Sequence, residues 1–251
     1  MASSEPIPHE LVSTPAAANV HIQPLPPLNP GDHLDQPTFH ARYEAMPEGF
    51  RAELIEGIVI VPSPIKSKHS RPDGLVHCWL ATFRAATPGT EFHPNFTVIL
   101  GPRSEPEPDS GLLILPACGG QTREEDDYIV GAPELLAEVC NTSEAQDLHS
   151  KRRDYERAGV KEYVIVVVRE RRVVWLVLRD GRFTTLEPDH DGIIRSTVFP
   201  GLWLDPVALL ENNWDRVIEV VRQGLQSPEH AAFVDRLQAE RKRRSGESGH
   251  P

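Results

Sequence analysis

Residues 133–168 read PELLAEVCNTSEAQDLHSKRRDYERAGVKEYVIVVV, and this stretch decides the fold. It holds two apolar runs of strand length, Leu135–Val139 and 162–168. Between them, the letters SEAQ form a capping-box pattern, which predicts a helix over 144–158 with Gly159 as its C-terminal stop. The order strand, helix, strand predicts a βαβ unit.

The segments on either side add antiparallel strands and further helices. Patterning predicts strands over 52–61 (with a turn at Gly57), 92–100, 112–115, 172–178 and 182–186. A short helix is expected over 39–45. A second helix should begin at a Ser70 cap, with Pro72 in its first turn, and end at Pro88. Helical structure is expected again from Pro206 to about Arg243. The sum is an α/β fold, a mixed β-sheet flanked by helices.

The two ends of the chain differ from its middle. Residues 1–37 are rich in proline and lack periodicity, so we expect a disordered or loosely packed arm. Residues 38–211 are expected to form one domain, and 212–251 a helical extension with a frayed basic tail. The basic run Arg241–Arg244 is more typical of a solvated helix end than of a phosphate site.

Composition bounds the function. The chain has 251 residues and is 39% hydrophobic, with no run of roughly 18 apolar residues and no signal-peptide pattern. The lack of such a run predicts no membrane span. Three cysteines without metal-ligand spacing favour a reducing, cytoplasmic location. The net charge of -11 predicts weak non-specific DNA affinity. Nucleic-acid binding then requires a local basic groove, a partner, or an oligomer such as a homodimer.

Glu138 and Asp109 are the first candidate site residues. Strand alternation places Leu136, Glu138 and Cys140 on one face. A carboxylate inside an apolar strand costs several kcal/mol unless it is paired or binds a metal. Asp109 follows Pro108 at the start of a neighbouring short strand, and two adjacent carboxylates favour a divalent cation. By itself, Asp109 is more typical of a turn residue.

Lys151 is the second unusual residue. Helical spacing aligns it with Leu148 and Tyr155, so it points along the packed stripe towards Glu138. An exposed lysine paired with a neighbouring aspartate is the competing interpretation. Glu53 and Glu56 flank an apolar pair, and either one could approach the same cluster.

Three sequence strings together resemble the Uma-two family of putative restriction endonucleases, in the PD-(D/E)XK nuclease superfamily. They are AELIEGIVIVPSPIKSKH (52–69), PD (108–109) and PELLAEVCNTSEAQDLHSKRRDYERAGVKEYVIV (133–166), and the resemblance covers about 38–210. It implies a restriction-endonuclease-like fold, DNA as substrate, and Mg²⁺ (or Mn²⁺) held by Asp109 and Glu138. It also implies Lys151 as catalytic lysine and Glu53 as the early acid.

The sequence departs from the superfamily pattern at Cys140, where a lysine is expected. A thiol is a poor Mg²⁺ ligand, so we expect the Cys140 backbone carbonyl to coordinate and Lys151 to supply the missing ammonium. His69 and Arg152 are accessory candidates, although His69 is more typical of a loop or capping histidine.

Two functions of different classes follow. The first is a metal-dependent endonuclease that hydrolyses phosphodiester bonds in DNA. The second is a nuclease fold kept as a non-catalytic binding or assembly module, which Cys140 and the acidic charge both favour. A cysteine-dependent hydrolase is the weakest alternative, because no histidine lies at a recognisable spacing.

Overall fold

A six-stranded mixed sheet forms the centre of the protein in the computed structural model, which describes residues 25–62, 67–140 and 146–247. Its strands, in spatial order, are β11 (Arg182–Thr185), β10 (Arg172–Arg179), β9 (Glu162–Val167), β8 (Leu135–Cys140), β5 (Ser110–Ile114) and β3 (Thr90–Pro94). Only β8 and β9 run parallel within this sheet, and the other neighbours are antiparallel. The predicted βαβ unit is therefore confirmed as the parallel pair at the middle of the sheet.

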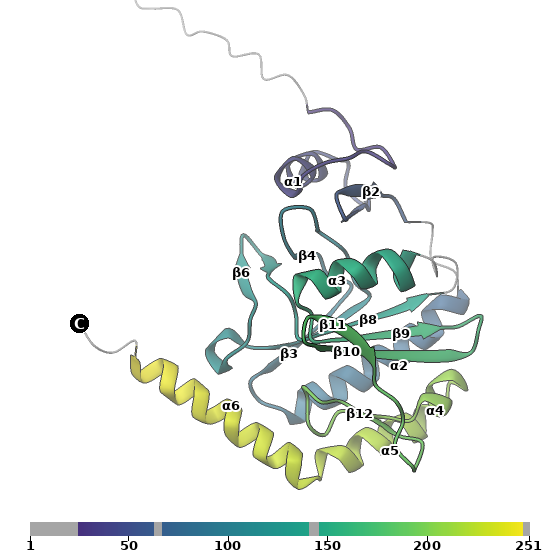
Figure 1. The fold of residues 1–251 in the computed structure, drawn as a ribbon, viewed down its shortest axis with the longest axis vertical. Helices are drawn as coiled ribbons and strands as arrows, with labels where there is room; N and C mark the ends of the chain where they lie inside the picture. Colours follow the sequence, from purple (N-terminus) through teal and green to yellow (C-terminus); the bar gives the residue numbers. More distant parts are fainter. Residues whose placement is uncertain (1–24, 63–66, 141–145, 248–251) are drawn as a thin grey trace, which may run out of the picture.

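Helices cover both faces of the sheet, as Figure 1 shows. One face packs against α2 (Ser67–Ala86), α4 (Pro206–Leu210), α5 (Trp214–Leu225) and α6 (Pro228–Glu247). The other face packs against α3 (Arg152–Ala158), which continues a π-helical segment η2 (Gln146–Lys151). Strand alternation divides β8 between these cores: Ala137 and Val139 belong to the first, Leu136 and Cys140 to the second.

An N-terminal segment lies over the α3 side of the sheet (Figure 1). It consists of α1 (Gln36–Glu44) and the hairpin β1 (Glu53–Ile55) and β2 (Ile58–Ile60). Its own small core includes Phe39 and Leu54, and Leu28 is buried there as well. The hairpin turn uses the left-handed residues Glu56 (φ 54°) and Gly57 (φ 83°), as the predicted turn requires.

One predicted strand is two strands. The pattern over 92–100 predicts a single strand, whereas β3 ends at Pro94 and β4 (Val98–Ile99) pairs with another sheet. Asn95 has φ 45° and turns the chain, and its N–H donates to the Asp109 carbonyl oxygen at 2.8 Å. The smaller elements without sequence predictions are β6 (Arg123–Glu125), β7 (Tyr128–Val130), β12 (Ile194–Arg195), β13 (Trp203–Leu204) and the 3₁₀ turn η1 (Pro116–Cys118).

Helix starts differ from the predictions more than helix ends do. Helix α2 begins at Ser67, before the expected cap at Ser70, with Pro72 inside it. Helix α3 ends as predicted, at Gly159 with φ 92°. Ser143 of the capping box lies outside the described residues. None of the helices in the described ranges combines the length and apolar character that crossing a bilayer requires.

Candidate functional site

Three charged side chains from distant parts of the chain meet on the α3 side of the sheet. The Lys151 Nζ atom lies 2.8 Å from Glu138 Oε1 and 2.9 Å from Glu53 Oε1. All three residues are at most 5% exposed. The sequence predicted that Lys151 points towards Glu138, and of the two acids near the hairpin it is Glu53 that joins them.

The helical segment before α3 directs Lys151 inwards. Lys151 is the last residue of the π-helical segment η2 and the first residue before α3. A π-helical turn is wider than an α-helical one and is frequent at functional sites. One turn later, Tyr155 points to the same sheet face, and its hydroxyl donates to Glu138 Oε1 at 3.0 Å. Glu138 is thereby held by an ammonium and a phenol from one helix.

Asp109 lies beside this cluster, directly before the adjacent strand β5. The register of β5 and β8 pairs Ser110 with Ala137, so the next residue, Asp109, is opposite Glu138. Opposed residues on antiparallel strands project to the same face of a sheet. The Asp109 Oδ2 atom accepts the Val139 N–H at 2.8 Å. Asp109 is half-buried, so it forms the more exposed side of the cluster.

Two further residues support these acids, and neither was singled out from the sequence. Glu107 donates its backbone N–H to Glu53 Oε1 at 2.8 Å. His77 of α2 lies with its Nε2 atom 3.0 Å from the Asp109 carbonyl oxygen and 3.2 Å from Asp73 Oδ1. The Glu107 contact uses a backbone N–H, so its residue type gives no signal of it. The His77–Asp73 pair has the i, i+4 spacing of a helix, whereas the contact of His77 with Asp109 joins residues 32 positions apart.

The donor chemistry of the cluster fits a hard divalent cation. Glu53, Asp109 and Glu138 supply carboxylate oxygens, which Mg²⁺ prefers. Asp109 and Glu138 are the two acids that the β5–β8 register brings opposite each other. In the part of the chain that the structure describes, no three His, Cys, Asp or Glu side chains already form a metal-binding group. Here the Lys151 ammonium supplies the positive charge between Glu53 and Glu138.

The remaining predicted site residues lie elsewhere or are engaged. Cys140 is buried, and its carbonyl oxygen accepts the Val168 N–H at 3.1 Å, so a metal at this carbonyl would share it with the sheet. Arg152 is exposed and reaches the Phe183 carbonyl oxygen at 3.4 Å. His69 lies in α2, and its side chain is outside the described residues.

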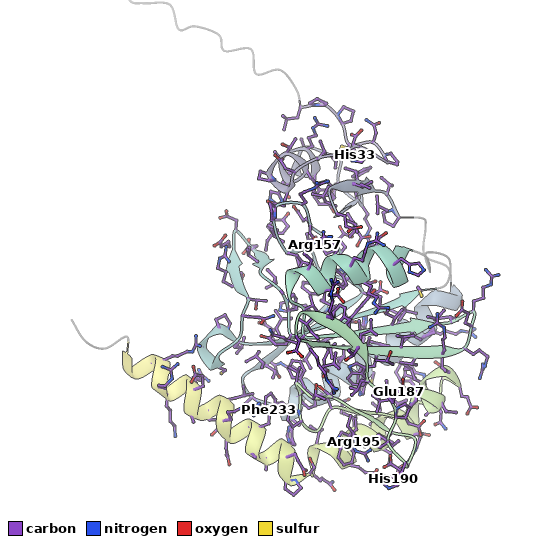
Figure 2. All side chains as sticks on the ribbon, in the orientation of Figure 1. His33, Arg157, Glu187, His190, Arg195 and Phe233 are labelled. Atoms are coloured by element: carbon purple, nitrogen blue, oxygen red, sulfur yellow. The ribbon has the colours of Figure 1, made fainter. Side chains whose placement is uncertain are left out.

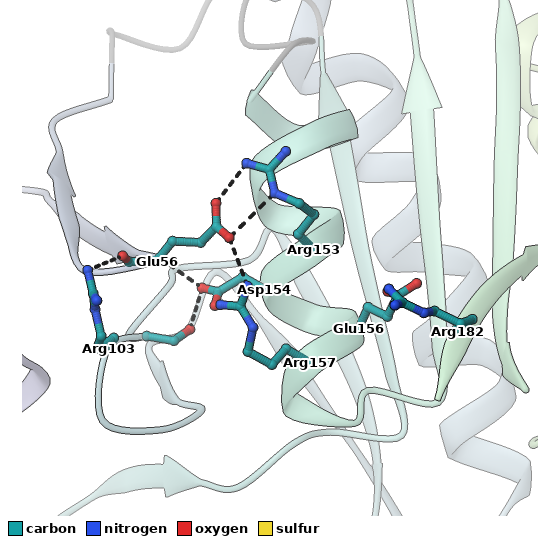
Figure 3. Close-up of polar contacts among 8 residues, drawn as sticks. Glu56, Arg103, Arg153, Asp154, Glu156, Arg157 and Arg182 are labelled. Atoms are coloured by element: carbon teal, nitrogen blue, oxygen red, sulfur yellow. Dashed lines mark hydrogen bonds and ion pairs between the residues drawn. The ribbon is translucent and has the colours of Figure 1, made fainter. Parts of the chain in front are cut away.

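A second polar network joins the outer face of α3 to the N-terminal hairpin (Figure 3). Glu56 pairs with Arg153 (2.8 Å) and Arg157 (3.2 Å). The hydrogen bond from Arg153 is the main cause that lowers the pKa of Glu56, and it outweighs burial, which acts to raise this pKa. Figure 2 labels Arg157 on the side of α3 nearest the N-terminal segment. Glu56 therefore fixes the hairpin that carries Glu53, and does not belong to the buried cluster.

Asp154 strengthens the same junction from inside. It is 4% exposed, and its Oδ2 atom accepts the Ser104 hydroxyl at 2.6 Å and the Glu56 N–H at 3.3 Å. Burial is the largest cause of its pKa shift and raises the pKa above the usual 3.8. The junction therefore holds α3, the hairpin and the loop before Glu105 in one arrangement.

Comparisons with known proteins agree with this architecture. The model of the Uma2 family, described as putative restriction endonuclease, matches residues 37–208. The chain is also similar to the crystal structure of a putative nuclease belonging to DUF820 from Anabaena variabilis ATCC 29413. That match has a TM-score of 0.56 and 15% sequence identity, and it covers 68% of this chain and 97% of the other. None of the curated proteins matched the sequence.

The family match spans more than half of the chain, and the structural likeness shows the restriction-endonuclease-like fold. The chain therefore belongs to the Uma2 family of putative restriction endonucleases.

Proposed function

We propose that this protein is a metal-dependent nuclease that hydrolyses phosphodiester bonds in DNA, with Mg²⁺ or Mn²⁺ held by Asp109 and Glu138. The observation that carries the proposal is the position of Lys151, whose Nζ atom lies 2.8 Å from Glu138 Oε1. Cys140 stands where the superfamily pattern has lysine, and Lys151 delivers an ammonium to the same acid from the helix instead. This placement supports the catalytic proposal over the non-catalytic module that Cys140 favours.

Each residue has a defined part in the proposed reaction. Asp109 and Glu138 would hold the divalent ion, which when bound would lower the pKa of a water and polarise the scissile phosphate. Lys151 places a fixed positive charge beside the reacting phosphate, where it stabilises the charge that develops during attack. Glu53 and Tyr155 hold Lys151 and Glu138 in place. Burial of Glu53, Glu138 and Lys151 strengthens the ion pairs among them, while the half-buried Asp109 faces the accessible side.

The experiment is plasmid nicking by the full-length protein with Mg²⁺, with Mn²⁺, and with a chelator. We expect nicking only with a divalent ion, and a loss of at least about 100-fold in Glu138→Gln and Asp109→Asn. The matched control is Glu170→Gln, which changes an exposed acid that pairs with Arg172 between β9 and β10, outside the buried cluster. It should keep the wild-type rate.

The variants must first be shown to fold, by circular dichroism and melting temperature. Metal-dependent nicking that persists in folded Glu138→Gln and Asp109→Asn would overturn the assignment of the acids. A wild-type protein that neither nicks DNA nor binds the ion would support the non-catalytic module instead.

A further inference from the structure

Arg51 is an exposed cation on the same side of the chain as Glu53. Ala52 and Leu54 pack into the N-terminal core, so the residues that alternate with them, Arg51 and Glu53, point to the opposite side. Glu53 lies in the buried cluster on that side. The side chain of Arg51 is 43% exposed, whereas that of Lys151 is 5% exposed. Arg51 therefore lies between the buried cluster and solvent.

Glu107 fixes Arg51 relative to the cluster. The Nε and Nη2 atoms of Arg51 both lie 2.8 Å from Glu107 Oε2, and the Tyr43 hydroxyl donates to Glu107 Oε1 at 2.7 Å. The backbone N–H of the same Glu107 holds Glu53. One residue thus positions both the exposed guanidinium and a buried acid, which limits the motion of Arg51 before any ligand binds.

The charges around Arg51 identify its neighbours. Partial burial lowers the pKa of Arg51, but the hydrogen bond and charge of Glu107, and then the charges of Glu53 and Asp109, outweigh this and raise it. Arg51 therefore lies within electrostatic reach of two acids of the proposed site. Asp109 is also the half-buried member of the cluster, so both residues mark its accessible side.

A nucleic-acid strand that approaches this side meets several carboxylates, which repel its phosphates. We propose that Arg51 binds a backbone phosphate of the DNA substrate next to the scissile one. A guanidinium has five N–H donors, so the same group can bridge Glu107 and a phosphate. This assignment rests on the proposed nuclease function, and it gives an acidic protein a local cation where the substrate enters.

The test measures DNA binding with Ca²⁺ in place of Mg²⁺, by fluorescence anisotropy of a labelled duplex at 50–200 mM salt. Arg51→Gln should weaken binding about tenfold and reduce the slope of log K against log salt by about 0.9. Arg51→Lys should restore the slope, because it restores the charge. In nicking assays with Mg²⁺, Arg51→Gln should raise KM by more than it lowers kcat.

The matched control is Arg172→Gln. Arg172 pairs with Glu170, and its side chain is 42% exposed, close to the value for Arg51, but it lies at the start of β10. The Arg172→Gln substitution should leave the DNA affinity and the salt dependence of binding at their wild-type values. If wild-type protein binds and nicks DNA while Arg51→Gln keeps the same affinity and slope, the Arg51 assignment is wrong and the nuclease proposal stands. If wild-type protein neither binds nor nicks, both fail.

Discussion

Replacement of Lys151 by methionine tests the buried cluster through stability. The substitution keeps much of the side-chain volume and removes the charge, leaving Glu53 and Glu138 buried without their shared ammonium. Two hydrogen bonds to charged groups are lost, at 2.8 and 2.9 Å, and each contributes about 1.5–3 kcal/mol. Removing one partner of a buried ion pair costs about 3–5 kcal/mol, which is consistent with the summed loss of these two hydrogen bonds.

We expect Lys151→Met to lower the free energy of unfolding by about 3–5 kcal/mol at pH 7, measured by urea denaturation. For a chain of this length the melting temperature should fall by roughly 6–20 °C. Added Mn²⁺ should restore part of the loss, because it replaces the missing charge. At 100 times its dissociation constant, the ion would restore about 2.7 kcal/mol.

Two controls make the result specific. Lys242→Met changes an exposed lysine of α6 and should stay within about 0.5 kcal/mol of wild type. The double variant Lys151→Met/Glu138→Gln should be more stable than Lys151→Met alone, because one of the two buried charges is gone. A Lys151→Met protein within about 1 kcal/mol of wild type would refute the buried ion pairs.

The remaining predictions concern close packing and buried titratable groups outside the candidate site. Gly224→Ala should destabilise by several kcal/mol, because its new Cβ would lie 2.2 Å from the Gly201 carbonyl oxygen, whereas Gly246→Ala meets nothing within 4 Å and should be neutral or stabilising in thermal melts. Burial raises the pKa of Glu162 above 4.5. The protonated Glu162 carboxyl therefore contributes its full stabilisation below pH 4.5, and this is lost as the pH rises through the folded-state pKa. Glu162→Gln should remove that pH dependence of the urea midpoint. Burial lowers the pKa of His230 below 6.5, so stability should fall as pH drops through 6.5, and His230→Gln should show no such fall.

The sequence predicts the centre of the fold well because two periodicities act there. The alternation of β8 places Glu138 on the α3 face, and helical spacing places Lys151 and Tyr155 opposite it. Side-chain spacing within one short segment was enough to predict that Lys151 points towards Glu138. The role of the Tyr155 hydroxyl was missed, because apolar packing against the sheet already explained its position.

Contacts that depend on irregular backbone were not predictable. The sequence predicts a helix over 144–158 but gives no sign that η2 is π-helical, and the left-handed Asn95 divides one expected strand into β3 and β4. The register that places Asp109 opposite Glu138 depends on how β5 pairs with β8, which neither strand encodes alone. Glu107 acts on Glu53 through its backbone, so its residue type carries no signal of this contact.

The most direct test of the metal site is anomalous diffraction from crystals of the full-length protein grown with Mn²⁺. We expect a peak between the carboxylates of Asp109 and Glu138, and none there in Asp109→Asn crystals. The chain offers another acidic cavity for comparison, with a volume of about 640 Å³ and a lining that includes Glu44, Glu91 and Asp126. Mn²⁺ bound only in that cavity, or nowhere in wild-type crystals, would contradict the assignment of the β5–β8 acids as the metal site.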